Sequence, residues 1–180
     1  MPEQFVSVTL ETARLTLRPR RVDEADVYRR LWTERDVRVP AHRRIDAAGR
    51  PSVEDIAEHL RTEGGSGLGL LAVVRKDSGD VIGYCGLVRS GNGAPGEPEL
   101  AFELLSRVHG FGYATEAAEA VVAWASEAGV ERLWASVRAW NLASRRVLAK
   151  LGFQESGTVE IDPTHGDSLL MVRELSSPST

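Results

Sequence analysis

The sequence predicts a single α/β domain, of the α+β kind, built on a mixed but mostly antiparallel β-sheet. Three features predict it: paired apolar runs joined by a short turn, amphipathic helix patterns, and a strand–helix–strand unit in the second half. A tight turn joins antiparallel strands, whereas a crossover helix joins parallel ones. Because 180 residues can bury one core but scarcely two, we expect one domain over residues 1–175 and a disordered tail over residues 176–180.

The first part of the chain predicts one strand and two helices. The alternating run LTLR, residues 15–18, is typical of a strand and stops at a proline. A helix follows over residues 23–35 with Asp23 as its N-cap, and a second over residues 52–62 with Ser52 as its N-cap. The glycine-rich run GGSG ends the second helix. The irregular loop between the helices is a candidate substrate-facing loop.

The middle of the chain predicts three strands. Apolar runs over residues 68–75 and 81–89 flank the turn sequence KDSGD, which is typical of a hairpin. Cys85 is the only cysteine, and its place in the second run suits a small buried residue better than an exposed nucleophile. A glycine- and proline-rich loop then leads to a strand over residues 99–105.

The last third predicts two helices and three strands. Gly129 follows a long apolar helical pattern, as expected for a C-terminal glycine. Asn141 is placed to cap the next helix, and Gly152 to stop it. The turn DPTHGD separates the final strands, and we expect a solvated hairpin there. In order, these elements are a helix over 113–128, a strand over 132–137, a helix over 141–151, and strands over 153–161 and 168–175.

Charge and composition argue against several classes of function. A net charge of −4 gives no general attraction to nucleic acid, and the N-terminal arginines are interleaved with acidic residues. The N-terminus has no basic segment followed by an apolar one, and no apolar run is long enough to span a bilayer. One cysteine cannot form an internal disulfide, and the histidines lack metal-ligand spacing. We therefore expect a cytoplasmic protein without a nucleic-acid, membrane or metal partner.

The segment RVHGFGYATEAAEAV lies at a predicted strand-to-helix junction. Gly110 and Gly112 let the backbone approach an anion, and the helix N-terminus provides unpaired amides and a positive dipole. The segment lacks both the GK[ST] of a Walker loop and the first glycine of a dinucleotide fingerprint. It predicts a phosphate-binding loop of another kind; the alternative is a plain tight turn.

Two motifs in this order resemble the GNAT superfamily of N-acetyltransferases. Arg107, Gly110 and Gly112 match its Q/R-x-x-G-x-G/A signature, in which loop amides bind the pyrophosphate of coenzyme A. The segment NLASRRVLAKLGF, residues 141–153, is similar to the family's helix after the fifth strand. The runs RLTLRP and GYATEA look like the Rim-type branch, whose best-known members acetylate the N-termini of ribosomal proteins.

The resemblance implies a seven-stranded sheet with about four helices, in which the parallel fourth and fifth strands splay apart. It implies acetyl-CoA as the co-substrate in that gap, attacked directly by a primary amine in a ternary complex. The implied acceptor is a protein N-terminal α-amine or a small-molecule amine. This branch often forms homodimers, so a homodimer is an open alternative.

The resemblance also assigns residues to the coenzyme. A backbone amide at Leu104 or Leu105 would polarise the thioester carbonyl as an oxyanion hole. Many superfamily members have a tyrosine on the last major helix where this chain has Leu148, and the Rim-type branch uses a serine, here Ser144, instead. The residues expected to bind coenzyme A are Leu104, Leu105, Arg107, Val108, His109, Gly110, Phe111, Gly112, Tyr113, Ala114, Asn141 and Ser144.

Glu99, Glu103 and Ser144 are the candidate catalytic residues. The two glutamates alternate with apolar residues along one strand and share a face, so either could take a proton from the amine, with Glu99 ranked first. The alternative is that both are ordinary solvent-side charges. Ser144 lies on the same helical face as Asn141 and would hydrogen-bond the departing sulfur; the alternative for both residues is helix capping.

Two other functions stay open at this point. The chain could bind coenzyme A as a regulator without catalysis, although the intact Glu99, Ser144 and glycine loop argue against this. It could also use another acyl donor such as succinyl-CoA, with Arg138 or Arg43 near the acyl group. Nothing in the spacing of the sequence demands a cation near the acyl group.

Overall fold

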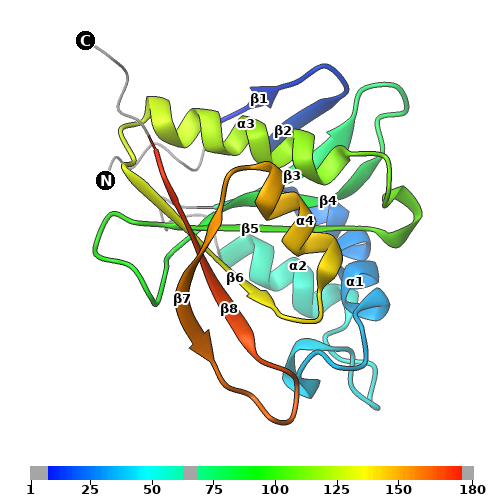
Figure 1. Ribbon diagram of the computed structural model, residues 1–180. Helices are drawn as coiled ribbons and strands as arrows, with labels where there is room; N and C mark the ends of the chain where they lie inside the picture. Colours follow the sequence, from blue (N-terminus) through cyan, green and yellow to red (C-terminus); the bar gives the residue numbers. More distant parts are fainter. Residues whose placement is uncertain (1–7, 63–68, 176–180) are drawn as a thin grey trace.

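The computed structural model describes residues 8–62 and 69–175, which form an eight-stranded sheet with helices against it (Figure 1). The strand order is β1-β2-β3-β4-β5-β6-β8-β7. The strands are β1 (Leu10–Glu11), β2 (Leu15–Pro19), β3 (Leu70–Arg75), β4 (Val81–Val88), β5 (Glu99–Leu104), β6 (Arg132–Arg138), β7 (Gln154–Glu160) and β8 (Ser168–Glu174). The helices are α1 (Ala25–Glu34), α2 (Val53–Thr62), α3 (Tyr113–Glu127) and α4 (Leu142–Lys150). The predicted GGSG terminator and the predicted tail lie outside the described residues.

The sheet is mixed, as the sequence predicts. Within the described residues β5 and β6 run parallel, with α3 as their crossover, and the other neighbouring strands run antiparallel. The parallel pair meets at one register position, Glu99 with Trp134, although β5 continues to Leu104. The two strands therefore meet at the start of β5 and splay apart toward its end.

The sheet has one strand more than the seven expected. The additional strand is β1, which has two residues and pairs antiparallel with β2 through Leu10 and Leu17. So short a strand shows no alternation in the sequence, because a period of two residues needs several residues to be visible. It extends the sheet at the edge where α3 lies close by.

The two N-terminal helices start differently. The prediction that Asp23 caps α1 is wrong: a 3₁₀ turn precedes the helix, and Glu24 occupies its N-cap. The carboxylate of Glu24 accepts a hydrogen bond from the backbone N–H of Arg21 at 2.9 Å. Ser52 caps α2 as predicted, since its Oγ accepts from the N–H of Asp55 at 3.1 Å and its own N–H donates back to that carboxylate at 2.8 Å.

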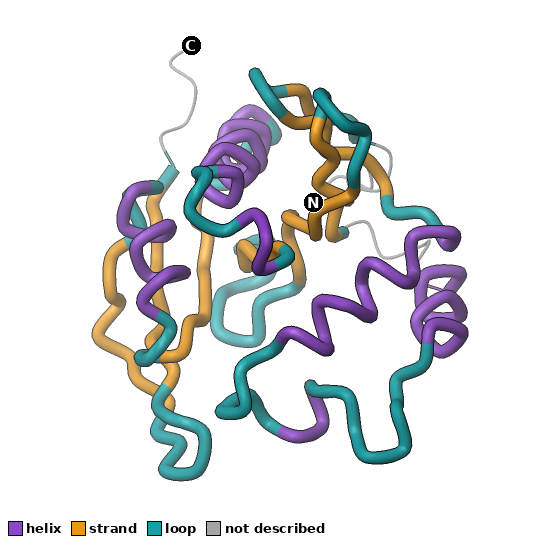
Figure 2. Tube along the Cα trace, turned by 90° about the vertical axis from the view of Figure 1, so that its right-hand side faces the viewer, coloured by secondary structure: helices purple, strands orange, loops and turns teal. Residues whose placement is uncertain are grey.

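The helices lie on both sides of the sheet. Figure 2 shows α1 and α2 on one side, and α3 and α4 on the other. The face of α3 toward the sheet is built from small residues, and Ala117, Ala118 and Ala125 are fully buried. Small side chains let the helix lie close to the strands. Gly129 ends this helix with a φ of 81°, as the sequence predicts.

The predicted hairpin between β3 and β4 is confirmed. The two strands pair antiparallel, and the N–H of Arg75 donates to the carbonyl of Asp80 at 2.9 Å across the turn. Cys85 in β4 is fully buried, and burial raises the pKa of its thiol. It is a core residue, as predicted. No helix in the described ranges has the length and apolar content needed to cross a bilayer.

Candidate active site

The glycine loop connects β5 to α3. After a 3₁₀ turn, Gly110 and Gly112 both adopt φ of 82°, the left-handed region that other residues enter only with strain. Gly112 is the N-cap of α3 and has no side chain to satisfy the first amides of the helix. The loop thus leaves backbone N–H groups and the positive end of a fifteen-residue helix free for an anion.

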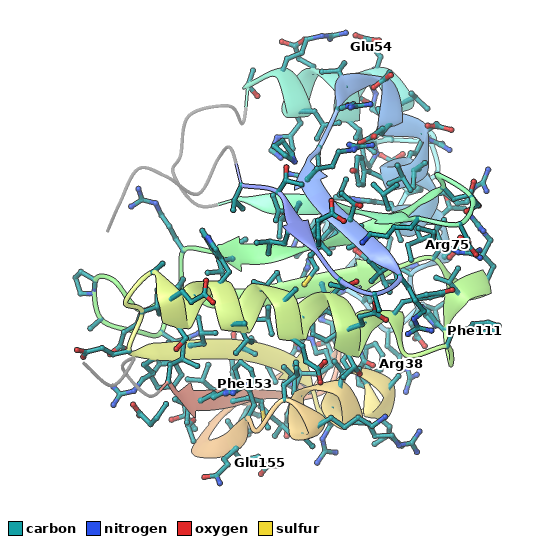
Figure 3. All side chains as sticks on the ribbon, turned by 90° about the horizontal axis from the view of Figure 1, so that it is seen from above. Arg38, Glu54, Arg75, Phe111, Phe153 and Glu155 are labelled. Carbon is teal, nitrogen blue, oxygen red and sulfur yellow. The ribbon has the colours of Figure 1, made fainter. Side chains whose placement is uncertain are left out.

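Two guanidinium groups lie beside this loop. The Arg14 guanidinium carbon is 4.4 Å from the centre of the Tyr113 ring, and that of Arg75 is 5.7 Å from the same centre. Phe111 stacks against Tyr113 with ring centres 6.1 Å apart and is itself exposed. Figure 3 shows Arg75 and Phe111 at the same end of α3. Both arginines are already paired with carboxylates, Arg14 with Glu116 and Arg75 with Asp77, so they balance negative charge beside the loop and leave the helix N-terminus as its source of positive potential.

The loop is held in place by contacts to other elements. The N–H of Ser106 donates to Glu34 at the end of α1 at 2.7 Å. The Nε2 of His109 lies 2.8 Å from the carbonyl oxygen of Leu104, so this ring nitrogen contacts the last residue of β5. Arg107, the first residue of the glycine signature, lies 3.7 Å from Asp80 and is about half exposed, with a side-chain exposure of 46%.

The backbone at the end of β5 decides which amide can face the gap. The N–H of Leu105 donates to the carbonyl of Ile82 in β4 at 2.9 Å. Successive N–H groups of a strand alternate between its two edges, so the N–H of Leu104 faces the other edge, toward β6. Of the two amides expected to polarise the thioester carbonyl, Leu105 is therefore already used. The side chains of Leu105 and Val108 are buried in the core, so any coenzyme contact they make is through the backbone.

Glu103 has its charge neutralised by neighbours. Its carboxylate accepts hydrogen bonds from Arg35 Nε at 2.8 Å and Nη2 at 2.7 Å, and from the hydroxyl of Tyr84 at 2.8 Å. Burial raises the pKa of Tyr84, which keeps its hydroxyl protonated as a donor. Both carboxylate oxygens are thus occupied, and Glu103 is poorly placed to accept a further proton from a substrate.

Glu99 lies in a different environment, at the point where β5 and β6 meet. Its carboxylate accepts a hydrogen bond from the N–H of Ser136 in β6 at 3.1 Å. Burial raises the pKa of Glu99 above its ordinary value, against the opposing effects of that hydrogen bond and of the Arg43 charge. A carboxyl group with a raised pKa beside the splayed strands has the properties of a general base.

The start of α4 combines a cap with an available hydroxyl. Asn141 caps the helix as predicted, because its Oδ1 accepts from the N–H of Ser144 at 3.1 Å. The cap uses the backbone of Ser144, and its hydroxyl has no hydrogen-bond partner within the described part of the chain. Leu148, at the position where many superfamily members have tyrosine, is buried in the core. Capping and a catalytic role are therefore compatible in this helix.

The loop after α1 reaches across to the start of α4. Arg38 stacks on Trp140 at 4.1 Å, and Figure 3 shows Arg38 beside that end of α4. The indole N–H of Trp140 donates to the carbonyl of His165 at 2.8 Å. Arg35 donates to the carbonyl of Arg43 at 2.6 Å and so fixes the other end of the loop. These contacts hold the loop between the end of α1 and the start of α4.

The turn DPTHGD joins the antiparallel strands β7 and β8, as the expected hairpin requires, and it contains side-chain contacts that the sequence did not predict. Asp162 accepts from the N–H groups of Thr164 at 3.1 Å and His165 at 3.0 Å and from Arg138 at 3.0 Å. The backbone hydrogen bond from His165, together with those from Thr164 and Arg138, lowers the pKa of Asp162 to about 2. Arg138 also donates to the carbonyl of Gly166 at 2.6 Å, so it is committed to this turn. The expectation of a plain hairpin missed these side-chain contacts.

Comparison with known protein families shows to which family this chain belongs. Residues 14–154 match a family model described as an acetyltransferase (GNAT) domain. The chain belongs to the GNAT family of acetyltransferases. The match covers β2 to the start of β7, and so contains the glycine loop, the splayed strands and α4.

Individual GNAT relatives agree with this. An uncharacterised N-acetyltransferase, p20, of Bacillus licheniformis is 28% identical over 156 residues, covering 83% of this chain and 84% of the relative. A solved GNAT-family structure from Bordetella pertussis has a TM-score of 0.71 and 27% identity over 92% of this chain and 99% of the other. RimJ of Mycobacterium smegmatis, solved in complex with CoA-disulfide, has a TM-score of 0.65 and 25% identity over 93% and 86% of the two chains. The last similarity supports the Rim-type branch.

The GNAT fold places the residues predicted from sequence on β5, on the glycine loop that follows it and at the start of α4, with two qualifications. Glu103 turns into an ion pair with Arg35, and the Leu105 amide turns to β4. Sequence reasoning missed two residues, Arg14 and Glu116, which form an ion pair at 2.6 Å beside the glycine loop. Both lie in runs that resemble the Rim-type branch, RLTLRP and GYATEA, and that was the available signal. Among the described residues, no three His, Cys, Asp or Glu side chains lie close enough to hold a metal ion.

Proposed function

We propose that this chain transfers an acetyl group from acetyl-CoA to a primary amine, with both substrates bound at once. One observation carries the proposal: the glycine loop at the N-terminus of α3 follows directly from the strand end that splays away from β6. An anion site and an open strand edge are thus adjacent, as a long ligand with a pyrophosphate at its middle requires. The CoA-disulfide bound to the related RimJ supports coenzyme A as this ligand.

The residues present fit the coenzyme. The amides around Gly110 and Gly112 bind the pyrophosphate, where a side chain at either position would be strained by its positive φ. The pantetheine arm lies along the free edge of β5, and the N–H of Leu104 donates to the thioester carbonyl. When bound, acetyl-CoA supplies the activated acetyl group.

Glu99 and Ser144 act on the two sides of the reacting carbon. Glu99 accepts a proton from the attacking amine, directly or through water, as the new C–N bond forms. Ser144 donates a hydrogen bond to the sulfur as the C–S bond breaks, and coenzyme A leaves. Glu103 serves the site through Arg35 instead, because that pair holds the loop after α1, which forms the acceptor side of the site.

The acceptor we propose is an α-amine of a protein N-terminus or a small-molecule amine. An α-amino group has an ordinary pKa of about 8 and is partly neutral at physiological pH, whereas a lysine amine, with a pKa of about 10.4, is almost fully protonated. A single carboxylate of raised pKa is a modest base and suits the first of these amines better. Succinyl-CoA receives no support from Arg138, which is already paired with Asp162, and keeps only Arg43, whose charge acts on Glu99, of the two cations considered for it.

The test is an acceptor panel with acetyl-CoA as donor. Purified protein is incubated with acetyl-CoA and N-terminal peptides, amino acids, polyamines or aminoglycosides, and free thiol is measured against the slow background of donor hydrolysis. Thiol release that depends on one acceptor, with the acetylated amine confirmed by mass spectrometry, is the expected result. Tight binding of coenzyme A without release from any acceptor would instead support a regulator. The panel is then repeated with succinyl-CoA, and release only with that donor would replace acetyl-CoA in the proposal.

A further inference from the structure

Glu116 is a carboxylate at an electrostatically sensitive position. It lies in the first turn of α3, four residues after Gly112. Its side chain is only 17% exposed, and both of its oxygens are occupied. Oε1 accepts from Thr12 Oγ1 at 2.6 Å and from the backbone N–H of Arg14 at 2.8 Å, while Oε2 accepts from Arg14 Nε and Nη2, each at 2.6 Å. Burial tends to raise the pKa of Glu116, but these hydrogen bonds outweigh it and hold that pKa below its ordinary value.

An ionised carboxylate here has opposite effects on the helix and on a bound anion. Negative charge in the first turn stabilises the helix dipole. The same charge, one turn from the loop, repels a pyrophosphate bound at that end of the helix. The Arg14 guanidinium, which bridges from the start of β2 to Glu116, cancels this repulsion while leaving the helix contact intact.

Arg14 also fixes the orientation of a loop peptide. Its Nη1 donates to the carbonyl of Phe111 at 2.9 Å. Because a trans peptide is planar, its C=O and the following N–H point in opposite directions. Holding the Phe111 carbonyl toward Arg14 therefore turns the N–H of Gly112 away from Arg14, to the side open to a ligand. Arg14 is close enough that a Cβ at Gly112 would lie 3.5 Å from its Nη2.

We propose that Arg14 is a positioning residue for the phosphates of the donor. It neutralises Glu116 and orients the Gly112 amide, and it acts through these groups without touching the reacting atoms. The inference rests on the proposed function, because it takes coenzyme A as the ligand of the glycine loop. It assigns the first arginine of the RLTLRP run a role in donor affinity.

The experiment compares donor affinity in Arg14→Gln, Glu116→Gln and the double variant, by calorimetry with coenzyme A. R14Q is expected to weaken coenzyme A binding by about tenfold, because it leaves an unpaired carboxylate beside a bound anion. The double variant is expected to recover only part of that loss, since the repelling charge is gone but the hydrogen bond to the Phe111 carbonyl is still missing. R14K keeps a positive charge beside Glu116 but not the fork that also holds the Phe111 carbonyl, so it is expected to bind coenzyme A more tightly than R14Q and more weakly than the wild-type chain.

Two further measurements separate positioning from general support of the fold. In steady-state kinetics with a working acceptor, R14Q should raise KM for acetyl-CoA with little change in kcat. It should leave kcat/KM for S-acetyl-pantetheine, which has no phosphates, unchanged. Glu119→Gln, an exposed carboxylate further along α3, is the matched control for E116Q, and Arg61→Gln on α2 is the matched control for R14Q.

The outcomes distinguish this inference from the proposed function. Wild-type affinity in a folded R14Q would overturn the inference alone, as would a double variant as weak as R14Q or an equal loss with S-acetyl-pantetheine. If R14Q does not fold, the comparison of R14K with E116Q decides: E116Q keeps Arg14 and loses the repelling charge, so it should bind coenzyme A more tightly than R14K, and equal or weaker binding by E116Q counts against the proposal. If the wild-type chain itself binds no coenzyme A, the proposed function fails and the inference falls with it.

Discussion

The guanidinium of Arg35 forms a two-point ion pair with the carboxylate of Glu103, with N–O distances of 2.8 and 2.7 Å. The residues are 68 positions apart in the chain, and the Arg35 side chain is only 10% exposed. The pair connects the end of α1 to β5 and holds the loop after α1 through the carbonyl of Arg43. It distinguishes the two candidate glutamates, because Glu103 has a fixed cationic partner whereas Glu99 accepts only from the backbone N–H of Ser136 among the contacts described above.

We expect Glu103→Gln to affect stability and acceptor binding more than the chemical step. Removing the charge leaves Arg35 without its ion partner, which should cost about 2 kcal/mol of unfolding free energy. KM for the acceptor should rise because the loop is less firmly held, while the acidic limb of the pH–rate profile is kept. Urea denaturation and a pH series of kcat/KM measure both effects. Loss of that acidic limb in E103Q would make Glu103 the base.

Glu99→Gln is expected to show the reverse pattern. Glutamine cannot accept the amine proton, so turnover should fall by about 100-fold, in the range for loss of a general base. In the wild-type chain the acidic limb should lie above the ordinary carboxyl pKa of 4.5, because burial raises the pKa of Glu99. That limb should vanish in E99Q. Wild-type turnover in a folded E99Q would show that Glu99 is an ordinary solvent-side charge on the strand and not the base.

The same pKa shift predicts how stability depends on pH. A carboxyl group whose folded-state pKa lies above its unfolded value binds protons more readily when folded, so its contribution to stability falls as pH rises from 4.5 through the folded pKa. E99Q removes this penalty. It should therefore be more stable than the wild-type chain at pH 7, with a difference that becomes small below pH 4.5. Chemical denaturation of both chains at several pH values tests this, and equal stability at pH 7 would contradict it.

The glycine loop predicts a strong effect of charge at Gly112. Gly112→Glu should abolish coenzyme A binding, because it places a carboxylate against the pyrophosphate. It should also cost about 1 to 2 kcal/mol of stability, since a side chain at positive φ is strained. Gly79→Glu is the matched control, because Gly79 has a similar φ of 74° in the β3–β4 turn and open space around it. Calorimetry should show coenzyme A binding by G79E and none by G112E. Equal affinities would show that the glycine loop is not part of the coenzyme A site.

The features that the sequence predicts well are local ones. The KDSGD hairpin, the Ser52 and Asn141 caps and Gly129 each depend on residues within one turn, where residue type alone decides the backbone. Local reasoning failed at Asp23, because the chain forms a 3₁₀ turn before α1 and the carboxylate of the neighbouring Glu24 accepts the hydrogen bond from the N–H of Arg21.

The features that the sequence does not predict depend on distant partners. Arg14 and Glu116 are 102 positions apart, and no periodicity links them before the fold is known. The alternation of β5 identified Glu99 and Glu103 as one face, but it could not tell which has a cation beside it. Only the path of α1 and the loop after it brings Arg35 to Glu103 and leaves Glu99 near the gap.

The start of α4 allows capping and catalysis to be tested separately. The cap joins the side chain of Asn141 to the backbone N–H of Ser144, and it does not use the Ser144 hydroxyl. Asn141→Ala should therefore cost about 1 kcal/mol of stability, the usual value for a lost N-cap, whereas Ser144→Ala should leave stability nearly unchanged. If the hydroxyl stabilises the departing sulfur, S144A should lower kcat by about tenfold and change the affinity for coenzyme A little. Thermal unfolding and steady-state kinetics on the two variants give the comparison. A fall in stability in S144A without a fall in kcat would leave Ser144 as part of the helix alone, because a group that acts only in the transition state alters turnover and not the folded state.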